Sequence, residues 1–277
     1  MSALARRARA LSRGPGLLLS LVLLALVAVA ALTPGLLTGH DPLVGVPADK
    51  LRPPSLDHPF GTDQLGRDLL SRVVHGTGET LRATVLAVAI GLVPGSLIGL
   101  LAGHLGGWVD DALMRLADVL LAIPGLLLSL ALITALGFGT TKVAVAVGVV
   151  GVAGFARVMR SEVLRVRESG YVEAALASGT RTSGILLRHV LPGARGPVAV
   201  FAAVEFGTVV LAISSLSFLG YGAAPPQPEW GSLVAGGRDH LATAWWLTTL
   251  PGLTIAATVL AANRVARALD QKPGGLS

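Results

Sequence analysis

Long apolar runs alternate with short polar stretches along the 277 residues of the chain. A transmembrane helix needs about 20 mostly apolar residues, with a range of about 17–25, and six runs meet this length. These runs lie near residues 16–37, 82–104, 113–136, 142–158, 197–219 and 245–265. The pattern therefore predicts an all-α membrane protein with six transmembrane helices.

The first apolar run follows a basic N-terminal stretch that carries four arginines. A basic stretch before an apolar core is also typical of a cleaved signal peptide. The core at 16–37 is longer than the usual 7 to 15 or so residues of a signal peptide, and further spans follow it. We therefore expect an uncleaved first transmembrane helix.

The distribution of arginine and lysine predicts which side of the membrane each polar segment occupies. The segment 157–195 carries seven arginines against three acidic residues, and both tails are basic. On the opposite side, residues 220–244 hold a single arginine, and residues 38–81 hold four basic and six acidic residues. By the positive-inside rule, the tails 1–15 and 266–277 and the 157–195 loop are expected to be cytoplasmic. Residues 38–81 then form an extracytoplasmic segment before a five-helix core, 82–265.

Composition supports the membrane assignment and excludes several other classes of protein. The mean hydropathy is +0.70 and only 14% of the residues are charged, against about 25% in soluble chains. The net charge of +6 does not indicate nucleic-acid binding, because the basic residues lie at the ends of apolar runs. The absence of cysteine excludes disulfides and thiolate metal sites.

The chain also lacks the usual motifs of catalysis. None of its three lysines follows a glycine, so it has no P-loop for nucleotide hydrolysis. No G-x-S-x-G elbow and no H-E-x-x-H pair is present. The six histidines are scattered without ligand spacing, which argues against a metal site. We expect a protein that is not an enzyme and that binds no cofactor of its own.

Glycines recur every fourth residue in the second apolar run, at Gly91, Gly95, Gly99, Gly103 and Gly107. This spacing forms a smooth groove along one helix face, on which a neighbouring backbone can approach closely. The groove has two interpretations, tight packing within this chain or contact with a second membrane subunit.

Three prolines lie inside the apolar runs, at Pro94, Pro124 and Pro251. Each removes a backbone donor, so we expect a kink at each position.

Few ionisable residues lie inside the predicted spans, which makes each of them a functional candidate. Asp118 is one turn from Arg115, and Asp111 is one turn before Arg115, a spacing that predicts an ion-pair ladder on one helix. Glu205 has no basic residue at i±3 or i±4, so it must face a cavity, a partner helix or a hydrogen-bond donor. Glu205 is our candidate for the transport pathway.

The polar segment between the fourth and fifth runs has a helical pattern of its own. Val172, Ala175, Leu176 and Gly179 fall at i, i+3, i+4 and i+7, on one narrow face of small and apolar residues. A second helical stretch is expected to end at Pro192. Such an element buries its apolar face either by docking on another protein or by lying on the lipid surface.

The same segment resembles the EAA loop of bacterial ATP-binding-cassette importer permeases. Glu173-Ala174-Ala175, then Gly179 and then Leu191-Pro192 match the pattern Glu-Ala-Ala, Gly and a distal Leu-Pro. Four further stretches resemble the second permease of the dipeptide, oligopeptide and nickel importers. They are HPFGTDQLGRDLLSRVVHG (58–76), DVLLAIPGLLLSLAL (118–132), SLSFLGYG (215–222) and PPQPEWGSL (225–233).

The resemblance implies the type I importer permease fold and a division of labour among several subunits. Glu173 to Gly179 would form a coupling helix that enters a cleft of an ATPase subunit, and Leu191 and Pro192 would brace the loop against the membrane helices. The chain would pair with a homologous permease and would work with two ATPase subunits, which bind ATP and Mg, and with an extracytoplasmic substrate-binding protein.

Two positions depart from the family pattern. Ile213 stands where the family often has an acidic residue, and Gly193 stands where it often has Asn. The first departure leaves open whether Glu205, two turns earlier, takes over a polar role in the pathway. The function implied is import of di- or oligopeptides through the bacterial cell membrane. Alternatives are the same machine carrying nickel or another small solute, a secondary carrier, and a membrane scaffold.

Overall fold

A computed structural model describes residues 15–170, 172, 178, 184 and 186–270 of the chain. This part of the chain is mostly helical, with one isolated bridge between Thr62 and Asp68. The long helices are α2 (Pro15–Leu32), α3 (Leu69–Leu105), α4 (Gly107–Ala122), α5 (Gly125–Leu136), α6 (Thr140–Arg167), α9 (Leu191–Phe218), α10 (Trp230–Gly237) and α11 (Trp246–Asp270). Short 3₁₀ turns are η1 (Pro34–Leu36), η2 (Pro47–Asp49) and η4 (Arg238–His240), and η3 (Leu186–Val190) is one turn of π-helix.

Five of these helices are long and apolar enough to cross a membrane. They are α2, α3, α6, α9 and α11. The pair α4 and α5 brings the number to six if it is counted as one broken span. The number of spans therefore agrees with the apolar pattern of the sequence.

Several helices extend beyond the predicted spans. α3 begins at Leu69, so the last part of the segment 38–81 is helical. The Asp68 carboxylate accepts a hydrogen bond from the Ser71 N–H at 2.7 Å and starts α3 there. Within the expected 157–195 loop, α6 continues to Arg167 and α9 already begins at Leu191.

The prediction that a helix ends at Pro192 is wrong. η3 runs directly into α9, and Pro192 lies in the first turn of α9. The first turn of a helix tolerates proline because the N–H groups there have no partner within the helix.

Proline has its largest effect in the third predicted span. The helix stops at Ala122, Ile123 is extended, and α5 begins after Pro124 at 92° to α4. The clash of the proline ring with the preceding residue drives that residue out of the helical region. Pro94 and Pro251 instead lie inside α3 and α11.

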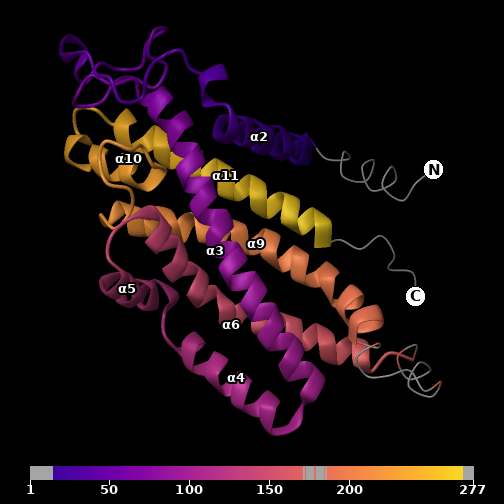
Figure 1. The fold of residues 1–277 in the computed structure, drawn as a ribbon. Helices are drawn as coiled ribbons and strands as arrows, with labels where there is room; N and C mark the ends of the chain where they lie inside the picture. The colour runs from indigo at the N-terminus through magenta and orange to yellow at the C-terminus, as the bar shows by residue number, and fades with distance from the viewer. Residues whose placement is uncertain (1–14, 171, 173–177, 179–183, 185, 271–277) are drawn as a thin grey trace.

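The helices are arranged around α3, which packs along α6 (Figure 1). α9 lies against α6 and α11, α2 lies on the outer side of α11 and α3, and α4 and α5 flank α6. The start of α2, the end of α11, the end of α6 and the start of α9 lie at one end of the bundle, and residues 33–68 and α10 lie at the other end (Figure 1). Many large apolar side chains on α2 and α4 remain exposed, as expected for helices that face lipid.

Candidate functional site

The glycine face of α3 lies against α6 of the same chain. A Cβ atom on Gly95 would lie 2.5 Å from the Val152 carbonyl oxygen, and one on Gly99 would lie 2.2 Å from the Ala156 carbonyl oxygen. The glycines therefore let two helix backbones meet without side chains between them. In this structure the groove serves packing within the chain.

The two outer glycines of the groove also face α6. A Cβ on Gly91 would lie 3.1 Å from the Phe155 ring, and one on Gly103 would lie 2.8 Å from a methyl of Val163. Gly107 does not belong to this face, because α3 ends at Leu105 and Gly107 begins α4 with a φ of 54°.

Charged side chains join α4 to α6 near the end of the bundle where α6 meets the 168–190 segment. Arg160 donates to both oxygens of Asp110, at 2.5 and 2.6 Å, and Arg157 donates to Asp118. The predicted ladder between Asp118 and Arg115 is therefore wrong. A partner on α6, 39 residues away in the sequence, meets Asp118 instead.

The end of α6 is also tied to the end of α3. Arg167 donates to the carbonyl oxygens of Gly103 at 2.6 Å and His104 at 3.0 Å. These carbonyls belong to the last turn of α3, where helical acceptors have no partner within the helix. The last turn of α6 is thus held to α3 at the point where the chain enters the 168–190 segment.

Most of the proposed coupling residues lie outside the described residues. They are Glu173, Ala174, Ala175 and Gly179. Val172 is described, and its side chain is buried in a cluster with Val163, Val166 and Val190. The start of the segment therefore uses an apolar residue to pack on its own chain. Leu191 and Pro192, which begin α9, are exposed.

Glu205 lies in the middle of α9 and is partly buried. Among the described residues its carboxylate has no hydrogen bond and no ion pair. The helical spacing gave Glu205 no basic partner, and the described part of the fold supplies none either. An apolar groove of about 480 Å³ runs between α2, α9 and α11 and is lined by Ala202, Ala203 and Phe206, but not by Glu205.

The opposite end of the bundle is organised by the stretch GTDQLGRD, residues 61–68. Asp63 accepts from the Arg67 Nε at 2.7 Å and from the backbone N–H groups of Leu65 and Arg67 at 2.8 and 3.0 Å. Gly66 has a φ of 75°, and a Cβ there would lie 1.9 Å from the Val46 carbonyl oxygen. The loop therefore requires glycine at this position.

The loop and the start of α3 also anchor distant segments. Arg72 donates to the carbonyl oxygen of Pro42 at 2.7 Å, and the Trp246 indole N–H donates to the Thr62 carbonyl oxygen at 3.3 Å. Arg72 thus ties the chain after α2 to the start of α3, and Thr62 ties the loop to the start of α11.

Glu229, in the stretch PPQPEWGSL, is fully buried at the start of α10. Its carboxylate accepts from the N–H groups of Gly231 and Ser232, both at 3.0 Å, and from the Thr80 hydroxyl on α3 at 3.2 Å. Burial raises the pKa of the Glu229 carboxyl, and these hydrogen bonds oppose that change. Next to it the Trp230 indole N–H donates to the Val73 carbonyl oxygen at 3.0 Å.

Comparison with known proteins decides what kind of molecule this is. Residues 95–274 match the family described as the binding-protein-dependent transport system inner membrane component. The chain belongs to this family. It is therefore the permease subunit of an ATP-binding-cassette importer, a membrane component that works with ATPase and substrate-binding partners.

Curated relatives of the permease cover most of its length. It is 36% identical over 245 residues to the dipeptide transport system permease protein DppC of Alkalihalophilus pseudofirmus. The matched region spans 88% of this chain and 80% of the relative. It is also 41% identical over 210 residues to the glutathione transport system permease protein GsiD of Pectobacterium atrosepticum. This matched region spans 76% of this chain and 70% of the relative.

Solved structures show the same fold. A chain of the MetNI methionine ABC transporter in an inward-facing form matches with a TM-score of 0.57 and 20% identity, over 72% of the permease and 96% of that chain. A chain of an amino acid ABC transporter crystallised with histidines matches with a TM-score of 0.58 and 16% identity, over 72% of the permease and 93% of that chain. The predicted type I permease fold is confirmed.

Sequence reasoning missed two polar sites of the permease. Glu229 gave no signal by spacing, because its partner Thr80 is 149 residues away. The spacing of the histidines in the sequence likewise gave no sign that two of them lie close together in the fold. His40, His58 and Asp68 offer ligand atoms that all lie within 4.8 Å of one another.

Proposed function

We propose that this permease imports di- or oligopeptides that a substrate-binding protein delivers. The observation that carries the proposal is the similarity, at 36–41% identity over 74–88% of the chain, to permeases named for dipeptide, glutathione and di/tripeptide transport. A homologous permease would form the other half of the pathway, and two ATPase subunits would supply the energy. Glu205, the partly buried carboxylate of α9 without a partner among the described residues, is the proposed polar residue of the pathway.

We propose the coupling role for Glu173, Ala174, Ala175, Gly179, Leu191 and Pro192. The support is that both ends of this segment are held firmly to the bundle. Arg167 anchors the end of α6 to α3, and Val190 and Ala194 are buried at the start of α9. A movement of a soluble domain against the segment is then transmitted to α6 and α9 as helix tilting.

The experiment is the ATPase activity of the co-purified complex in lipid nanodiscs with its binding protein added. Peptide-loaded, nickel-loaded and empty binding protein are compared, in the wild type and in Glu173→Ala. Stimulation by peptide-loaded protein alone, lost in Glu173→Ala, supports both the substrate and the coupling helix. Glu168→Ala is the matched control, because Glu168 is an exposed glutamate just before the coupling segment.

Each other result contradicts a named part of the proposal. Stimulation by nickel-loaded protein alone would show that the substrate is nickel rather than a peptide. It would not contradict the coupling role of the helix. An equal rate in Glu173→Ala and wild type removes the coupling role from Glu173. A complex without ATPase subunits contradicts the multisubunit importer.

We also propose that both termini and the coupling segment face the cytoplasm. The absence of native cysteine makes this testable with single-cysteine variants and a membrane-impermeant maleimide. Leu56→Cys, at a fully exposed position in the 38–68 segment, is expected to react in intact spheroplasts. Ser277→Cys is expected to react only after permeabilisation, and the reverse pattern contradicts the orientation.

A further inference from the structure

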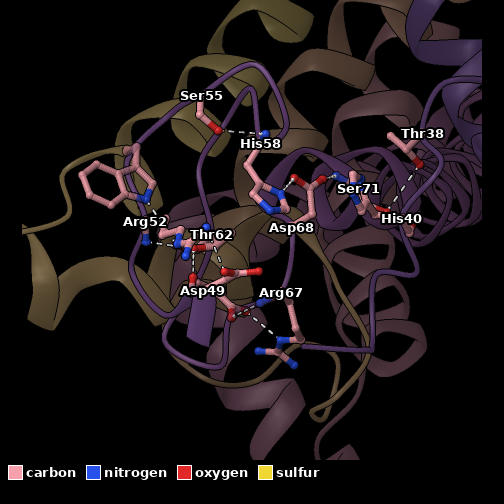
Figure 2. Close-up of polar contacts among 12 residues, drawn as sticks. Thr38, His40, Asp49, Arg52, Ser55, His58, Thr62, Arg67, Asp68 and Ser71 are labelled. Atoms are coloured by element: carbon pink, nitrogen blue, oxygen red, sulfur yellow. Dashed lines mark hydrogen bonds and ion pairs between the residues drawn. The ribbon is translucent and has the colours of Figure 1, made fainter. Parts of the chain in front are cut away.

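Two histidines and an aspartate meet where the chain after α2 crosses the start of α3 (Figure 2). His40 follows η1, His58 lies in the loop before GTDQLGRD, and Asp68 is the residue that starts α3. The ring centroids of the two histidines are 5.2 Å apart. The three residues come from separate parts of the chain, so only the fold brings them together.

The hydrogen-bonded pair His58–Asp68 is a few tenths of an ångström closer than two ligands of one metal ion. The His58 Nδ1 lies 2.9 Å from the Asp68 Oδ1. In a tetrahedral site with metal–ligand bonds of about 2.0–2.1 Å, neighbouring ligand atoms are roughly 3.3 Å apart. An ion can therefore replace the hydrogen bond between these two groups with little movement of either residue.

The aspartate is held in place by its second oxygen. The Asp68 Oδ2 accepts from the Ser71 N–H at 2.7 Å, and the side chain of Asp68 is almost fully buried. A carboxylate whose other oxygen is hydrogen-bonded is the usual arrangement of a well-oriented metal ligand.

His40 supplies the third ligand and the freedom of movement that the site needs. Its backbone carbonyl accepts from the Ser71 hydroxyl at 2.5 Å, which holds His40 beside the start of α3 (Figure 2). Its side chain is exposed, so the imidazole can turn to close the remaining distance, which is at most 4.8 Å between ligand atoms. Exposure also leaves a fourth position open to water.

We propose that His40, His58 and Asp68 form a binding site for one divalent transition-metal ion of the zinc type. Two imidazoles and a carboxylate suit Zn²⁺, whereas Mg²⁺ and Ca²⁺ prefer sites made of oxygen. The bound ion ties the chain after α2 to the start of α3 at the end of the bundle that carries α10. It is a resident ion, separate from any solute that the permease carries.

The test is calorimetric titration of Zn²⁺ into the purified full-length permease in detergent, with an affinity tag that contains no histidine. We expect one saturable site per chain and a rise of the melting temperature with Zn²⁺ concentration, because a ligand of the folded state stabilises it. Mg²⁺ is expected to give neither signal. Co²⁺ is expected to give the visible absorption of a four- or five-coordinate site.

Three variants make the assignment specific. His40→Ala and His58→Ala are each expected to weaken Zn²⁺ binding at least tenfold, the lower end of the loss seen when ligand geometry is disturbed. His240→Ala is the matched control, because His240 lies at the same end of the bundle in η4 and outside the cluster. It is expected to bind like the wild type.

The His40→Ala variant also separates lost binding from misfolding. Since the His40 side chain is exposed, the melting temperature of this variant without Zn²⁺ is expected to equal that of the wild type. Absence of a saturable Zn²⁺ site in the wild type overturns the proposal, and the cluster is then a hydrogen-bonded pair only. Equal Zn²⁺ affinity in His40→Ala and wild type overturns it as well.

Discussion

The Arg160 guanidinium donates to both oxygens of the Asp110 carboxylate, from Nε at 2.5 Å and from Nη2 at 2.6 Å. This paired contact joins α6 to α4 across 50 residues of sequence. A planar guanidinium that meets both oxygens of a carboxylate fixes orientation as well as distance. α4 is therefore held to α6 at a defined angle, about two turns before the end of α6.

Removal of this contact is expected to destabilise the permease. In Arg160→Ala the partly buried Asp110 loses its partner, which is expected to lower the free energy of unfolding by about 1–3 kcal/mol. Arg160→Lys keeps the charge but loses the second hydrogen bond. Its free energy of unfolding is therefore expected to lie between those of the wild type and Arg160→Ala. Thermal unfolding in detergent measures the order of the three proteins.

The control for Arg160 is Arg165→Ala. Arg165 is exposed and pairs with Glu162 one turn earlier on the same helix. Exposed pairs of this kind contribute little, so the expected change is within about 0.5 kcal/mol. An equal loss of stability in both alanine variants would show that the α4–α6 contact contributes no more than an exposed ion pair.

The closest backbone approach of α3 and α6 predicts that Gly99→Ala is destabilising. The added Cβ would lie 2.2 Å from the Ala156 carbonyl oxygen, so one of the two helices must move. Overpacking of this kind typically costs about 1–3 kcal/mol. The measurement is the unfolding midpoint of the purified chain in a denaturant titration.

Gly252→Ala is the matched control for Gly99→Ala. Gly252 lies inside α11, and a Cβ there would meet no neighbouring atom within 4 Å beyond the adjacent backbone of its own helix. Alanine is a better helix former than glycine by about 0.5–1 kcal/mol, so this variant is expected to be as stable as the wild type or more stable. A loss of stability in Gly252→Ala but not in Gly99→Ala would contradict the packing argument.

Glu229 predicts a pH dependence of stability. Burial raises the pKa of its carboxyl in the folded state above the ordinary value of 4.5. The folded state therefore binds more protons than the unfolded state between the two pKa values, so stability falls as the pH rises through this window. Below pH 4.5 the contribution is fully present.

The variant Glu229→Gln is expected to lack this component, since an amide does not titrate. As the pH rises above 4.5, the melting temperature of the wild type should fall relative to that of Glu229→Gln. Glu168→Gln, at an exposed position, is the control for the substitution of a glutamate by glutamine in itself. A constant difference for Glu229→Gln would show that the buried carboxyl does not titrate in this window.

Glu205→Gln tests the proposed pathway residue. The substitution keeps the size of the side chain and removes the charge, so expression and melting temperature are expected to stay close to those of the wild type. Uptake of labelled peptide into proteoliposomes that contain the complete importer is expected to fall severalfold, while basal ATPase activity persists. Normal uptake by Glu205→Gln would remove Glu205 from the pathway.

The pattern of apolar runs in the sequence was sufficient to predict the membrane-spanning part of the fold. Each apolar run is local, so its existence shows in any window of about 20 residues. The ends of the helices were less predictable. α3 extends back to Leu69 because the Asp68 side chain caps it, and α9 begins at Leu191 because Pro192 suits a first turn.

The polar contacts were the least predictable part. The local spacing of Asp118 and Arg115 predicted a pair, but the fold brings Arg157 of α6 to Asp118. Local spacing describes only the neighbours on one helix, and a long arginine on an adjacent helix reaches the same carboxylate. Histidine spacing likewise gave no sign of the His40–His58 contact, because both residues lie in segments without periodic structure.

The sequence by itself determined that this protein is a helical membrane permease, because apolar length and the EAA-like pattern are properties of continuous segments. Only the tertiary structure decided which polar groups meet. Thr80 and Glu229 are 149 residues apart, and His40, His58 and Asp68 come together from three segments. Such contacts depend on how the helices pack and how the connecting chain crosses them, and neither leaves a periodic signal in the sequence.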